Sequence, residues 1–151
     1  MQATEQNITA AHPLERFLAI LGAITCLVIT VVVWRSVSAY QSTWPLPGLY
    51  FIELPALGIV SAFAFIRGGQ SGRIVIWAAL GIFTAFCVLG AFSVGFLYVP
   101  IVLIFAIIAV SSSVRLGQPI GKSLGICLIA GVAQAALMLT AIRLLDPGAV
   151  F

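Results

Sequence analysis

The sequence contains very little charge. Of its 151 residues only 7% are charged, seven basic and four acidic, whereas 62% are hydrophobic. A soluble domain carries about 25% charged residues because its surface faces water. So few charges could not cover a water-exposed globule of this length, which indicates that most of the surface faces lipid.

Side chains that carry chemistry are equally scarce. The single histidine, His12, lies near the N-terminus, so the sequence holds no Ser-His-Asp or Cys-His set. Cys26, Cys87 and Cys127 lie far apart in apolar stretches without a C-x-x-C pair, which is typical of small buried residues. We therefore expect no enzymatic activity, no metal site and no cofactor.

The net charge of +3 does not favour a nucleic-acid partner, because no basic cluster suits contacts to phosphates along a strand. In membrane proteins a basic excess marks cytoplasmic loops that face anionic headgroups. Membrane lipids are therefore the first expected partners.

The apolar runs predict the fold class, an all-α bundle of transmembrane helices. A span needs about 20 apolar residues. Five segments qualify: residues 17–34, 49–66, 74–92, 96–114 and 123–145. The uncharged run 74–114 would be about 60 Å long as one helix, so we expect it to fold back between Gly90 and Pro100. A single domain over 14–146 is thus predicted, between a polar tail (1–13) and a short C-terminal tail (147–151).

The first apolar run could also be a cleaved signal peptide, which would leave four spans. Arg16 precedes it, and Val37-Ser38-Ala39 resembles a small-residue cleavage site. The run is longer than the 7–15 residues of a signal peptide, and Arg35 stands where the cleavage region would begin. We expect the helix to be retained.

Charge asymmetry predicts a cytoplasmic N-terminus and an external C-terminus. In that orientation the inner side holds Arg16, Arg67, Arg73, Arg115 and Lys122, and the outer side holds Arg35 and Arg143. The aromatic residues expected at the outer interface are Trp34, Tyr40, Trp44, Tyr50 and Tyr98, with only Trp77 at the inner one. The similar basic segments 67–73 and 115–122 are predicted turns. They reflect either a shared compartment, which we favour, or a duplicated helical hairpin.

Glu53 is the one acidic residue inside a predicted span, just before Pro55. A carboxylate at membrane depth needs a partner or water, so Glu53 is a candidate functional residue. The first interpretation is an intramembrane ion pair with Arg35 across the hairpin of the first two spans. The alternatives are contact with the outer interface, or a proton or cation transport site.

Gln134 lies in the middle of the last span, where an amide usually forms an interhelical hydrogen bond. Small residues recur four apart at Gly58 and Ala62, Gly81 and Ala85, Ala91 and Gly95, Gly121 and Gly125, and Gly131 and Ala135. This spacing lets helices approach closely, within the chain or in a homo-oligomer.

Two stretches resemble a type of small, uncharacterised bacterial multi-pass membrane protein. They are Pro47-Gly-Leu-Tyr-Phe-Ile-Glu53-Leu, and Gly90-Ala-Phe-Ser-Val-Gly95 with the following Phe-Leu-Tyr-Val-Pro100. The resemblance covers about a third of the chain. It implies location in a bacterial inner membrane and no known activity.

Two classes of function remain open. The first is a non-enzymatic accessory or assembly protein whose helices pack against a membrane-complex partner or against copies of itself. The second is a small proton- or cation-coupled transporter or channel that uses Glu53. We favour the first because transport needs a route lined by several polar groups, and the sequence offers few.

Overall fold

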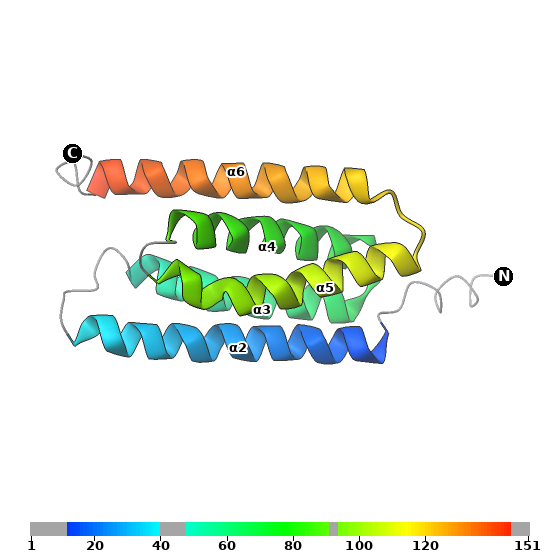
Figure 1. Ribbon diagram of the computed structural model, residues 1–151, viewed down its shortest axis with the longest axis horizontal. Helices are drawn as coiled ribbons and strands as arrows, with labels where there is room; N and C mark the ends of the chain where they lie inside the picture. The colour runs from blue at the N-terminus through cyan, green and yellow to red at the C-terminus, as the bar shows by residue number, and fades with distance from the viewer. Residues whose placement is uncertain (1–11, 40–47, 91–93, 146–151) are drawn as a thin grey trace.

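The computed structural model describes residues 12–39, 48–90 and 94–145, and within them it is a bundle of antiparallel helices (Figure 1). The elements are α2 (Pro13–Ser38), α3 (Gly48–Arg67), α4 (Gly69–Leu89), the short 3-10 helix η1 (Gly95–Tyr98), α5 (Val99–Arg115) and α6 (Ile120–Leu145). With η1 and α5 counted together, five segments of the described ranges are long and apolar enough to cross a membrane. The chain is a multi-pass membrane protein, and the predicted all-α bundle of five spans is confirmed.

Helices α2 and α4 begin furthest ahead of the predicted spans. Helix α2 begins at Pro13 because the side chain of His12 accepts a hydrogen bond from the backbone N–H of Leu14 and so caps the first turn. Helix α4 begins at Gly69, so most of the predicted basic turn 67–73 is helical. The reversal needs only Gly68 and Gly69, whose φ angles of 78° and 82° suit residues without a Cβ.

The predicted reversal between Gly90 and Pro100 is confirmed. Helix α4 ends at Leu89, and the backbone N–H of Gly95 donates to the carbonyl of Gly90 over 2.8 Å. A Cβ on Gly95 would lie within 3 Å of the backbone of Gly90. Two glycines therefore allow the backbone approach that closes this turn, and Pro100 occupies the first turn of α5.

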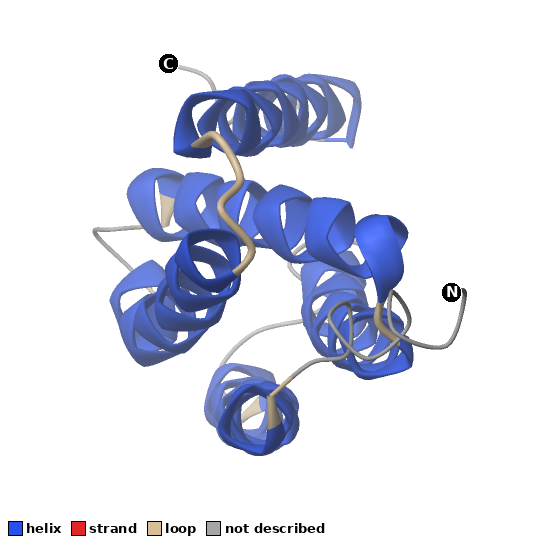
Figure 2. Cartoon of the chain, turned by 90° about the vertical axis from the view of Figure 1, so that its right-hand side faces the viewer, coloured by secondary structure: helices blue, strands red, loops and turns tan. Residues whose placement is uncertain are grey.

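The helices are arranged so that α2 and α6 lie on opposite sides of the bundle (Figures 1 and 2). Helix α2 packs against α3 and α5, and both of these also pack against α4. Helix α6 packs on α4 and touches α5 only slightly. Helix α4 is the most buried of the five spans and α6 the least. The last helix is therefore attached to the bundle almost entirely through α4.

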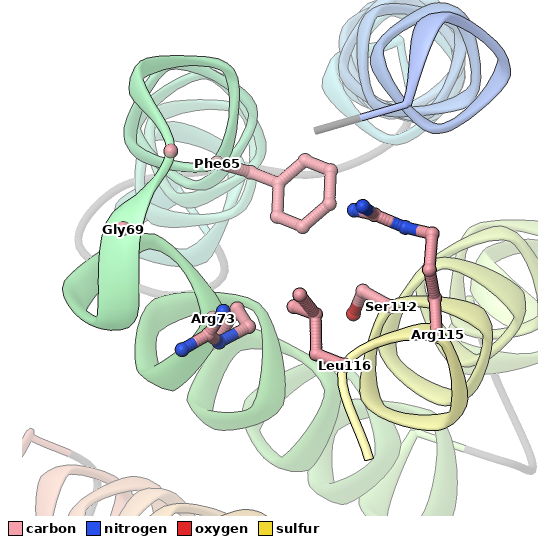
Figure 3. Close-up of a pocket in the computed structure, with 7 residues that line it drawn as sticks. Phe65, Gly69, Arg73, Ser112, Arg115 and Leu116 are labelled. Carbon is pink, nitrogen blue, oxygen red and sulfur yellow. The ribbon is translucent and has the colours of Figure 1, made fainter. Parts of the chain in front are cut away.

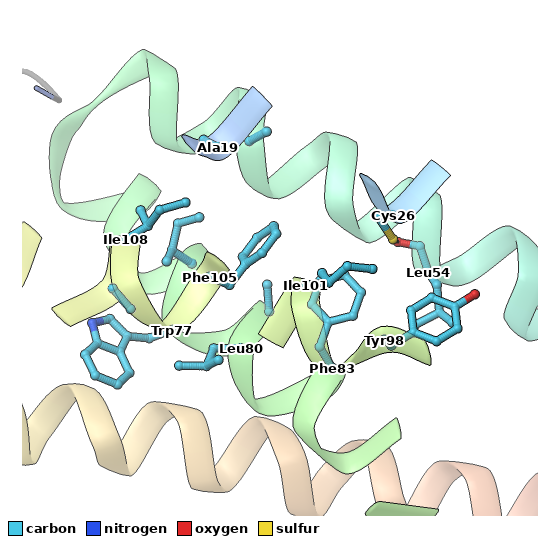
Figure 4. Close-up of a cluster of buried hydrophobic side chains, with 14 of the residues drawn as sticks. Ala19, Cys26, Leu54, Trp77, Leu80, Phe83, Tyr98, Ile101, Phe105 and Ile108 are labelled. Atoms are coloured by element: carbon cyan, nitrogen blue, oxygen red, sulfur yellow. The ribbon is translucent and has the colours of Figure 1, made fainter. Parts of the chain in front are cut away.

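The apolar core lies between α2, α3, α4 and α5 (Figure 4). Its largest fully buried side chains include Phe83, Phe105 and Tyr98. The hydroxyls of Tyr98 and Thr30 lie 2.9 Å apart in a hydrogen bond between η1 and α2. Tyr98 therefore faces the core and not the outer interface where it was expected. Tyr40 and Trp44, assigned to that interface with it, lie outside the described residues.

Glycines set the contact between α4 and α6. A Cβ on Gly81 would overlap the backbone carbonyl of Cys127, and Gly131 approaches the carbonyl of Gly81 in turn. This small-residue spacing serves packing within the chain. Gly125, with the same spacing from Gly121, has open space where a Cβ would lie.

We expect Gly81→Ala to weaken the attachment of α6. The added methyl group must push the two backbones apart, and overpacking of this kind costs about 1–3 kcal/mol. Thermal unfolding in mild detergent should show a lower midpoint for this variant. Gly125→Ala is the matched control, because its methyl group meets no atom within 4 Å; an equal loss of stability in both variants would contradict the close contact.

Candidate functional site

The structure brings together two polar residues that the sequence singled out separately. The side-chain amide of Gln134 on α6 donates a 2.9 Å hydrogen bond to Oε1 of Glu53 on α3. Gln134 is buried, with 7% of its surface exposed, whereas Glu53 is exposed. The interhelical contact expected of Gln134 is thus present, and it is made with the only acidic side chain expected at membrane depth.

Arg35 does not join this contact. No ion pair links Arg35 and Glu53 in the part of the chain that the structure describes, and Arg35 is exposed. The buried face of α2 runs through Cys26, Thr30 and Val33. Arg35 follows Val33 by two positions, about 200° around the helix, so its side chain leaves from the side opposite the bundle.

The Glu53–Gln134 pair lies in a groove between α3 and α6 with a volume of about 430 Å³. Leu49 and Ile52 line it from α3, and Leu137, Met138 and Ala141 line it from α6. The hydroxyl of Tyr50 is buried beside this groove and has no hydrogen-bond partner. The groove exists because α6 packs on α4 and leaves α3 uncovered.

The hydrogen bonding of Glu53 is incomplete. One carboxylate oxygen accepts from Gln134, and the other has no hydrogen-bond partner among the described residues. A neutral amide cannot balance an ionised carboxylate in a lipid-facing groove, so the group favours a cation or further hydrogen-bond donors from outside the chain. Chemically, the groove is an apolar binding surface with one strong acceptor.

A second polar cluster joins α2 to α5 at the other end of the bundle. Nη2 and Nε of Arg115 donate to the two carboxylate oxygens of Glu15 over 2.9 and 3.3 Å. Oε2 of Glu15 also accepts from the backbone N–H of His12 over 2.9 Å, which completes a capping box. The hydroxyl of Ser111 lies 3.5 Å from Oε1.

Sequence reasoning missed this ion pair because it began the first span at residue 17. The signal was present as His12 and Pro13 followed by Glu15, a helix start with an acidic third residue. Histidine at the cap position, in place of serine, threonine or aspartate, made that signal weak. Glu15 is only 5% exposed. A charge buried to this extent needs a counter-charge, which Arg115 supplies.

No group of three metal-ligating side chains occurs in the described ranges, and the three cysteines are unpaired. Comparison with known protein families, with curated proteins and with solved structures finds no match to this chain. The chemistry of the groove is therefore the basis for assigning a function.

We expect Arg115→Gln to destabilise the bundle, because it leaves Glu15 buried without a counter-charge. The loss should lie between the roughly 1 kcal/mol of an exposed ion pair and the 3–5 kcal/mol of a buried one, since Arg115 is one-third exposed. Denaturant unfolding of both single variants and of Glu15→Gln/Arg115→Gln gives the coupling energy. Additive losses would contradict the pairing. Arg143→Gln, which alters an exposed cation outside any ion pair of the described residues, is the neutral control.

Proposed function

We propose that this protein is a non-enzymatic accessory or assembly protein of a membrane complex, which binds a transmembrane helix of a partner in the groove between α3 and α6. The observation that carries the proposal is the exposed carboxylate of Glu53, held by Gln134 at one oxygen and unpartnered at the other. The groove around it is otherwise almost entirely apolar.

The chemistry of the groove favours a helix over a lipid chain. An acyl chain fills apolar space but offers nothing to a carboxylate, whereas a helix can present Lys, Arg or a hydroxyl together with apolar neighbours. The lining residues on α6 extend from Gln134 to Ala141, which is about two helical turns. The occupant we propose is therefore a partner helix that carries a cationic or hydrogen-bond-donating side chain facing Glu53.

We further propose that the membrane is a bacterial inner membrane, with the N-terminus cytoplasmic and the C-terminus external. One observation supports the orientation and a second supports the choice of membrane. The described cations gather mainly at the end of the bundle where α2 and α4 begin and α3 and α5 end, as the positive-inside rule expects of a cytoplasmic side. The resemblance to small bacterial multi-pass proteins supports the choice of membrane.

A small proton- or cation-coupled transporter is the second candidate, because Glu53 is exposed to an open groove and could bind a cation. Transport also needs polar groups along a path across the membrane. The polar side chains that line the groove, Tyr50, Glu53 and Gln134, all belong to the one cluster. The groove therefore favours binding over conduction.

Photo-crosslinking in native membranes tests the proposal. A photoreactive residue at Leu137, on the groove wall, should give one discrete adduct, which mass spectrometry identifies as a membrane protein with a donor side chain in the crosslinked helix. Glu53→Leu should remove this adduct, because the apolar variant loses the acceptor. Ile129 is the matched control position, since it is on the same helix, is 73% exposed and lies outside the groove.

Three outcomes would overturn the proposal. An adduct with lipid alone, or with a second copy of this chain, would show that the groove has another occupant. Equal adducts from Leu137 and Ile129 would show no preference for the groove. Proton flux into liposomes that Glu53→Gln abolishes, with insertion unchanged, would establish the transporter instead.

A further inference from the structure

A small cavity lies at the opposite end of α3 from Glu53, between the α3–α4 turn and the end of α5 (Figure 3). Gly68, Gly69 and Arg73 line it on one side, and Ser112 and Arg115 line it on the other. Its volume is about 10 Å³, enough for a single water or a single oxygen of a larger group. Two arginines are an unusual lining for so small a space.

The side chain of Arg73, which lines this cavity, lacks a hydrogen-bond acceptor among the described residues. Its Nε is buried from solvent and has no hydrogen-bond partner. A charged donor that is withdrawn from water without an acceptor costs more than a neutral one. The cavity beside it therefore favours an occupant that accepts hydrogen bonds and carries negative charge.

The start of α4 adds to the same preference. Helix α4 has 21 residues, and Gly68 at its cap position has no side chain to accept from the first-turn N–H groups. These groups and the helix dipole give this end a partial positive charge. Because Gly68 and Gly69 line the cavity, the start of α4 and the Arg73 side chain both lie beside it.

The other lining groups do not supply the missing acceptor. Two nitrogens of Arg115 already donate to Glu15, which balances most of that charge and leaves Nη1 outside the ion pair. The hydroxyl of Ser112 donates to the carbonyl of Ala109. Helices α3 and α5 end at the same cavity, and their last carbonyls offset the partial positive charge at the start of α4. The unbalanced positive charge at the cavity therefore comes from the Arg73 side chain.

We propose that this cavity binds one oxygen of a phosphate group, with Arg73 as its main donor. Arg73 lies four residues into α4, about 6 Å along the helix, so the cavity is at the depth of phospholipid headgroups. The phosphate of an anionic phospholipid is the ligand that this position favours, and free phosphate has the same chemistry. This site is at the other end of α3 from the groove and does not depend on the function proposed there.

Arg73→Gln and Arg67→Gln separate a built site from general charge attraction. Both remove one cation near the α3–α4 reversal, but Arg67 is exposed, lies 4.3 Å from the ring centroid of Phe63 and does not line the cavity. Protein in a neutral detergent is titrated with phosphatidylglycerol, with diacylglycerol of the same chains, and with inorganic phosphate. Native mass spectrometry counts the bound ligand, and thermal unfolding gives the shift in midpoint.

Phosphatidylglycerol should bind and raise the unfolding midpoint of the native chain and of Arg67→Gln, and diacylglycerol should not. Arg73→Gln should bind about 10-fold more weakly, as expected for the loss of a charge-assisted hydrogen bond. The same pattern with inorganic phosphate would support the site with free phosphate as its ligand. The proposal would be overturned if the native chain and both variants bound equally, or if both variants lost binding equally. It would also be overturned if neither phosphatidylglycerol nor inorganic phosphate bound, which would leave water as the occupant.

Discussion

In the core of a bilayer a polar group finds no water, so a buried hydroxyl, amide or charge is stabilised chiefly by a partner within the protein. This constraint explains which helices of the bundle are joined. Among the described residues, the side-chain contacts that cross between elements include Thr30 with Tyr98, Trp77 with Ser113, Arg115 with Glu15, and Gln134 with Glu53. Each contact joins two specific atoms. Together these contacts set the axial and rotational positions of the helices, which apolar packing alone would leave less well defined.

The last of these contacts differs from the others because its helices are not packed together. Helix α6 is held by the glycine contact with α4, where Gly81 meets the backbone of Cys127. It reaches α3 chiefly through Gln134, across a groove that its own position leaves open. The same arrangement therefore creates the apolar surface, exposes Glu53 to it, and leaves one carboxylate oxygen available to a partner.

The sequence was sufficient to predict features that depend on the length of apolar runs. It was insufficient to predict which way a side chain points around its helix. The five spans and the reversal at Gly90 follow from apolar runs that exceed or match the bilayer. The depth of Glu53 and Arg35 suggested a pair, but depth says nothing of the angle around each helix, and Arg35 points away from the bundle. Glu15 was missed because helical capping by His12, and not hydropathy, determines where α2 begins.

Recognition of a donor side chain by Glu53 can be measured with synthetic transmembrane helices. Two peptides of the same apolar sequence, one with a single arginine and one with methionine at the depth of Glu53, are labelled and reconstituted with the protein in liposomes, and energy transfer reports association. The arginine peptide should associate about 10-fold more tightly, as for a charge-assisted hydrogen bond, and Glu53→Leu should abolish the difference. Equal association of the two peptides with the native chain would contradict a recognition role for Glu53.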